Sequence, residues 1–180
     1  MVTLWSRLPA RRDVVYVFSA VVFAVYSWSI RGFLFQLSSL ILYYNIWQII
    51  AVLFYLMAFA LLESTAFTGT LALAGFLLPQ KWFRDGFAYK GFLATLVIGL
   101  AMIKLQSYLY VLNYGLPDIG ILGWGVGITL VALVALFFLF QNVSLLQKFL
   151  LNVEERLQVF IYLYVPLGIA GLLVILLRNI

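Results

Sequence analysis

The sequence predicts an all-α integral membrane protein with about five transmembrane helices. Of its 180 residues, 66% are hydrophobic and 9% are charged, whereas about a quarter of the residues in a soluble protein are charged. The mean hydropathy is +1.14. Aromatic residues make up 18% of the chain, and most tryptophans lie near the ends of apolar runs, as they do at membrane interfaces. We therefore expect residues 1–180 to form a single polytopic membrane domain in lipid.

The first expected span covers residues 14–30. Basic residues precede it, so the N-terminus resembles a signal peptide in outline. The apolar stretch nevertheless ends in the bulky residues Tyr26, Trp28 and Ile30 and has no small-residue cleavage site. We expect a retained first span with a boundary at Arg31.

The region 33–80 allows two interpretations. It is long enough for two spans of about 20 residues each with a turn at Glu63, Ser64 and Thr65. It could instead hold one long helix that starts near residue 45, preceded by an interfacial segment at 38–48 and ended by Pro79.

The distribution of basic residues favours one long helix here, because Lys and Arg in short loops prefer the cytoplasmic side. With a single crossing and an inner N-terminus, eight basic residues lie inside and two outside, Lys104 being set aside. Two crossings would leave four inside and six outside. Five spans are therefore favoured, and six remain the alternative. The eight inner residues are Arg7, Arg11, Arg12, Lys81, Arg84, Lys90, Lys148 and Arg156.

Three further spans are expected at 91–112, 119–140 and 157–177. The segment 142–156 places apolar residues at helical spacing with charged residues between them, so it predicts an amphipathic helix at the inner surface. The last span contains Pro166, which predicts a kink.

The residue types exclude several functions. The chain has no Cys and no His, which excludes disulfides, thiolate nucleophiles, His-ligated haem and zinc, and His-based triads within it. It also has no nucleotide-binding fingerprint and no acidic cluster with metal-ligand spacing. We expect neither a cofactor nor an enzymatic activity. The net charge of +5 indicates topology signals and attraction to anionic headgroups, with no nucleic-acid partner.

Two charges within the expected spans form the candidate ligand site. Glu63 and Lys104 would lie about 25 and 21 Å from the inner boundary on consecutive antiparallel helices. An isolated charge in hydrocarbon is costly and normally pairs or faces an aqueous cavity. We expect an ion pair between them, serving either as a structural clamp or as a substrate, ion or proton site.

Two other features are candidates for binding. Lys81, Trp82, Arg84 and Lys90 lie in an alternation of basic and aromatic residues at 78–91, which indicates contact with anionic lipid headgroups at the inner interface. Small residues recur every four positions on four spans and allow close helix packing, either within the chain or against another subunit. They are Ala20 and Ala24; Ser64, Thr68 and Ala72; Gly91, Thr95 and Gly99; and Gly123 and Gly127.

These features support two functions. The first is a non-catalytic subunit or scaffold that packs with other membrane proteins or with itself. The alternative is a small transporter or substrate-binding membrane component that uses Glu63 and Lys104. A lipid-modifying enzyme is disfavoured because no nucleophile and base stand together. We expect the chain in the prokaryotic cell (inner) membrane with a cytoplasmic N-terminus.

Overall fold

The computed structural model describes residues 9–78, 83, 85–111, 119–141 and 144–178, and every regular element in these ranges is a helix. The expected all-α class is confirmed. The six helices are α1 (Arg11–Tyr43), α2 (Ile46–Leu77), α3 (Phe87–Val111), α4 (Ile119–Gln141), α5 (Ser144–Leu157) and α6 (Val159–Arg178).

Four of these helices are long and apolar enough to cross a membrane, judged over the described residues. They are Arg11–Tyr43, Ile46–Leu77, Phe87–Gln106 and Val159–Arg178. The fifth expected span corresponds to α4, whose described apolar portion, Gly123–Leu139, is shorter than these. The chain therefore has the helices of a membrane protein, and the expected amphipathic segment is confirmed as α5.

Helix α1 differs from the expected first span. It does not end at Arg31 but continues to Tyr43, so the segment expected to lie at the interface is mostly helical. The reason is local: Gly32 alone does not stop a helix, and no proline follows it before residue 44. The break comes at Asn45, whose side chain accepts a hydrogen bond from the Gln48 backbone N–H and caps α2.

Helix α2 runs without interruption through Glu63, which confirms one long helix and excludes a turn at residues 63–65. The hydroxyls of Ser64 and Thr65 donate to the carbonyl oxygens of Ala60 and Leu61, one turn earlier. These bonds satisfy polar groups that would otherwise favour a turn. Helix α6 likewise continues through Pro166.

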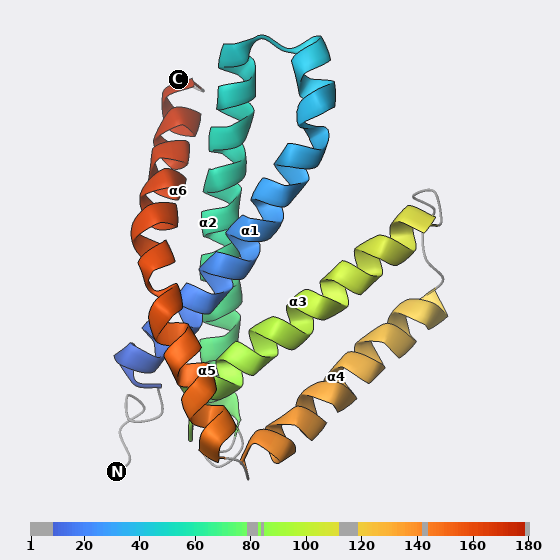
Figure 1. Cartoon of the computed structure of the whole chain (residues 1–180), viewed down its shortest axis with the longest axis vertical. Coiled ribbons are helices and arrows are strands. Elements are labelled where there is room, and N and C mark those ends of the chain that lie inside the picture. Colours follow the sequence, from blue (N-terminus) through green and yellow to red (C-terminus); the bar gives the residue numbers. More distant parts are fainter. Residues whose placement is uncertain (1–8, 79–82, 84, 112–118, 142–143, 179–180) are drawn as a thin grey trace.

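The helices form a bundle with a separate arm (Figure 1). Helices α1, α2 and α6 make the bundle, in which α2 packs extensively against both α1 and α6. Helices α3 and α4 leave its base together and slant away from α2 (Figure 1). The base also holds the start of α1, the end of α2 and all of α5, whereas the α1–α2 turn and the end of α6 lie at the opposite end (Figure 1).

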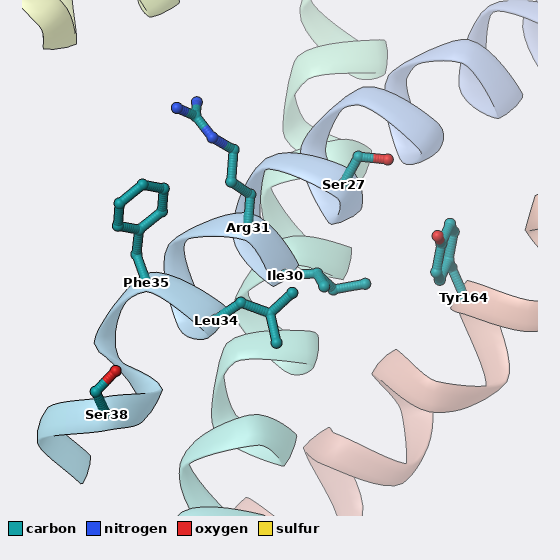
Figure 2. A pocket seen from close by; sticks show the side chains of 7 residues that line it. All are labelled: Ser27, Ile30, Arg31, Leu34, Phe35, Ser38 and Tyr164. Carbon is teal, nitrogen blue, oxygen red and sulfur yellow. The ribbon is translucent and has the colours of Figure 1, made fainter.

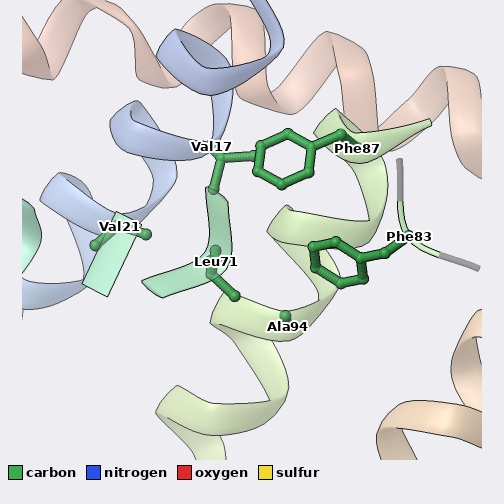
Figure 3. Packing of buried hydrophobic residues seen from close by; sticks show 6 residues of the cluster. All are labelled: Val17, Val21, Leu71, Phe83, Phe87 and Ala94. Carbon is green, nitrogen blue, oxygen red and sulfur yellow. The ribbon is translucent and has the colours of Figure 1, made fainter. Parts of the chain in front are cut away.

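The core lies at this base, where α1, α2 and α3 meet. Figure 3 shows its main cluster, with side chains from α1, α2 and α3 together with Phe83, which precedes α3. A second cluster joins Ala20 of α1 to Leu150 of α5. The base is therefore held together by apolar packing. The main cluster consists of Val17, Val21, Leu71, Phe83, Phe87 and Ala94.

Candidate functional site

The structure does not form the expected ion pair. Glu63 on α2 and Lys104 on α3 are both exposed, and within the described part of the chain neither side chain makes an ion pair with the other. The two helices diverge from the base (Figure 1). The role of these residues in binding a ligand stays a prediction.

The ion pair is absent because α3 packs against α1 and α4 instead of α2. Consecutive antiparallel helices usually pack together, but α3 packs against α1 and α4 and shares no extended contact with α2 in the described ranges. Gly91 allows this approach: a Cβ atom at this position would lie 2.5 Å from Cγ2 of Val17 on α1. Ser64 and Thr68, which belong to the expected ridge of small residues on α2, are buried in the bundle, while Glu63 is exposed.

The expected headgroup site is described only at Lys90, since Lys81, Trp82 and Arg84 fall outside the described residues. Lys90 is 2% exposed, and its Nζ lies 5.6 Å from the ring centroid of Tyr89. Its side chain is therefore packed into the base, and its role in binding lipid headgroups stays a prediction.

A polar cluster that sequence reasoning missed attaches α5 to α1. Arg12 donates to the Tyr16 hydroxyl from Nε at 2.8 Å, and the Tyr16 hydroxyl donates to Glu155 Oε1 at 3.3 Å. Arg12 also pairs with Glu155 at 3.6 Å. The four-residue spacing of Arg12 and Tyr16 is visible in the sequence, but nothing in it points to Glu155, which is 139 positions from Tyr16. Because the Arg12 and Glu155 side chains are largely exposed, their ion pair orients α5 more than it stabilises the fold.

Small residues inside the bundle are used for internal packing. A Cβ atom at Gly171 of α6 would collide with the carbonyl oxygen of Phe54 on α2, and one at Gly168 would meet the Tyr26 hydroxyl of α1. These two glycines therefore allow α6 to lie close to α1 and α2, as small residues do between membrane helices.

The glycines of α4 are not used in this way. Gly123, Gly125 and Gly127 are exposed, and a Cβ atom added at any of them would meet nothing within 4 Å. Gly123 and Gly127 line a groove of about 700 Å³ together with Trp124, which is 76% exposed. This surface, the α4 groove, consists of Gly120, Gly123, Trp124, Gly127, Ile128, Val131 and Ala132.

The described residues contain no group of three or more side chains suited to bind a metal ion. Comparison with known proteins gives no further guidance, because no family model, curated protein or solved structure matches the chain.

Proposed function

We propose that this chain is a non-catalytic subunit or scaffold of a membrane assembly and that it contacts its partner through the α4 groove. The observation that carries the proposal is the contrast between two sets of glycines. Neighbouring helices occupy the space beside Gly91, Gly168 and Gly171. The space beside Gly123 and Gly127 is open. In membranes, close helix approach at small residues drives association, so an unfilled ridge is available to another helix.

The shape of the arm supports the same function. Helices α3 and α4 contact each other but extend away from α2 and α6 (Figure 1). Large apolar side chains along α4 are exposed, among them Trp124, Val131 and Phe138. A hydrophobic surface of this kind is compatible with lipid, but only a helix of a neighbouring protein can fill the groove between Gly123 and Gly127 with close backbone contact.

We further propose five crossings with the N-terminus in the cytoplasm of a prokaryotic cell. Helix α4 would provide the fifth crossing, although its described apolar part, Gly123–Leu139, is shorter than the four other candidate spans. Arg11 and Arg12, Lys90 and Arg156 lie on the helix ends at the base, and Arg178 lies at the opposite end (Figure 1). This distribution fits an inner base under the positive-inside rule.

A transporter remains the alternative, with Glu63 and Lys104 as its charged groups. It would require a polar cavity that reaches at least one of them. Among the described residues, neither the α4 groove nor the groove between α1 and Tyr164 of α6 is lined by Glu63 or Lys104, which favours the subunit.

Native electrophoresis of complexes extracted in mild detergent tests the proposal. The double variant Gly123→Leu with Gly127→Leu would fill the α4 groove. We expect the wild-type chain to migrate in an assembly larger than one chain and the double variant to migrate as a single chain. Gly69→Leu is the matched control, because Gly69 is also an exposed helical glycine with nothing within 4 Å. If wild type and both variants migrate alike, the α4 groove is not the contact.

A further inference from the structure

A second groove, about 680 Å³ in volume, lies along the C-terminal half of α1 and faces α6. We call it the Arg31 groove. Its lining consists of six α1 residues between Ser27 and Ser38 and of Tyr164 from α6 (Figure 2). It is separate from the α4 groove, with which it shares no residue.

Arg31 provides the groove with a positive charge that no carboxylate neutralises. It is exposed, and among the described residues no ion pair involves it. Its guanidinium carbon lies 5.2 Å from the ring centroid of Trp28 and 5.6 Å from that of Phe35. Such contacts hold the cation in place without cancelling its charge. Figure 2 shows the guanidinium extending beside the Phe35 ring.

Arg31 lies closer to the middle of the bundle than Arg178, the other described basic residue of the bundle toward the end opposite to the base. Tyr26 and Gly168 lie side by side where α1 meets α6. Arg31 is about 7 Å beyond Tyr26 along α1, and Arg178 is about 15 Å beyond Gly168 along α6. Arg31 is thus roughly 8 Å closer to the middle of the bundle than Arg178. A cation on a membrane-spanning helix requires an anionic partner or a path to the interface, and lipid phosphates are the anions found at the interface.

The rest of the groove combines polar and apolar groups as an amphiphile would require. Within the described residues, the hydroxyls of Ser27, Ser38 and Tyr164 make no hydrogen bond, so they can donate to a ligand. Ile30 and Leu34 provide an apolar side that points toward Tyr164 (Figure 2).

The α6 wall of the groove is held in place by aromatic contacts. The Tyr164 ring stacks on Tyr26, with centroids 4.8 Å apart, and on Phe160 at 5.7 Å. Tyr26 itself is fully buried. A wall fixed in this way loses little conformational entropy when a ligand binds.

We propose that the Arg31 groove binds one anionic phospholipid, in the leaflet opposite to the base of the bundle. Arg31 holds the phosphate, and an acyl chain lies along Ile30 and Leu34 on the side of α1 that faces Tyr164 (Figure 2). The net negative charge of the lipid matches the single unpaired cation. The proposal does not depend on the partner that occupies the α4 groove.

Native mass spectrometry of the full chain tests this site. The protein is released from micelles that contain equal amounts of phosphatidylglycerol and phosphatidylcholine, whose phosphate charge is compensated by choline. We expect one phosphatidylglycerol to be retained per chain. Arg31→Gln should weaken its retention about tenfold, because charge-assisted hydrogen bonds are lost, while Arg31→Lys should retain the preference.

The matched control is Arg178→Gln, which removes the same charge at the same end of the bundle, where the Arg178 guanidinium carbon lies 5.9 Å from the Tyr55 ring centroid. We expect it to retain the lipid. The proposal is overturned if Arg31→Gln binds like wild type, if both Gln variants lose the lipid equally, or if phosphatidylcholine is held as tightly. Displacement of the lipid by millimolar glycerol phosphate would also overturn it, because the ligand would then be a soluble phosphate. An unchanged thermal midpoint of Arg31→Gln ensures that any loss is not unfolding.

Discussion

Gly171 and Gly69 are both helical glycines, yet the lack of a side chain has a different consequence at each. At Gly171, α6 lies against the backbone of α2, and an added Cβ atom would collide with the carbonyl oxygen of Phe54. At Gly69 there is nothing within 4 Å. A backbone carbonyl within a helix cannot rotate away as a side chain can, so the first position is constrained by packing and the second is not.

We therefore predict that Gly171→Ala lowers the free energy of unfolding by about 1–3 kcal/mol, the usual cost of overpacking. Gly69→Ala should be neutral or slightly stabilising, since alanine has the higher helix propensity. Thermal unfolding in detergent, followed by helical circular dichroism, provides the measurement. Equal midpoints for the two variants would show that α6 does not lie as close to α2 as the structure places it.

A second residue-scale prediction concerns Glu63 and Lys104. Because they make no contact in the structure, the stability changes of Glu63→Gln and Lys104→Met should add within about 0.5 kcal/mol in the double variant. Unfolding of the four proteins in a double-mutant cycle measures the coupling. A coupling well above that limit would show that the two side chains meet in the membrane, as the sequence alone suggested.

At the scale of single helices, α1 and α2 form a long hairpin whose turn is set by local chemistry. Both helices exceed 30 residues, so each is longer than the roughly 20 residues that cross the hydrocarbon. The hairpin must tilt or extend beyond the interface. Asn45 defines the turn through a capping box, in which it exchanges hydrogen bonds with Gln48 at 2.9 and 3.0 Å.

Replacement of this cap should shorten or fray the start of α2. We expect Asn45→Ala to lower the free energy of unfolding by about 1 kcal/mol, and Asn45→Asp to retain most of the stability, because aspartate also caps helices. Urea or detergent unfolding of the three proteins distinguishes these outcomes. If Asn45→Ala matches wild type, the turn is maintained by its surroundings rather than by the cap.

At the scale of the whole molecule, the arrangement of the helix ends predicts which of them face opposite sides of the membrane. The α1–α2 turn and the start of α3 lie at opposite ends of the bundle (Figure 1). If α2 crosses the membrane once, these two sites must face opposite compartments. The charge count favours the same arrangement, because five of the described basic residues lie at the base, namely Arg11, Arg12, Lys90, Lys148 and Arg156.

Labelling with a membrane-impermeant maleimide tests this topology, and the absence of native Cys gives a clean background. In intact cells we expect Tyr44→Cys to be labelled from outside and Asp85→Cys only after the cells are opened, since both positions are exposed. Thr65→Cys, in the middle of α2, should resist labelling in both preparations. Labelling of residues 44 and 85 from the same side would exclude a single crossing by α2.

The sequence by itself determined those properties that depend on local composition and periodicity. Low charge content and long apolar runs predicted long apolar helices, and four helices among the described residues are long and apolar enough to cross a membrane. The distribution of basic residues favoured a single helix through Glu63, and the amphipathic pattern of α5 was readable from its spacing. Each of these results from interactions within one segment or between a segment and its solvent.

Only the tertiary structure decided which faces meet. It placed α3 against α1 through Gly91 and Val17, which left Glu63 and Lys104 apart. It also showed that other helices pack against Gly168 and Gly171 of α6, while no other described helix packs against Gly123, Gly125 and Gly127 of α4. A ridge of small residues has the same four-residue spacing whether or not another helix packs against it. The difference depends on a helix that is distant in the sequence. Helix packing is set by the mutual fit of distant surfaces, which a single segment does not encode.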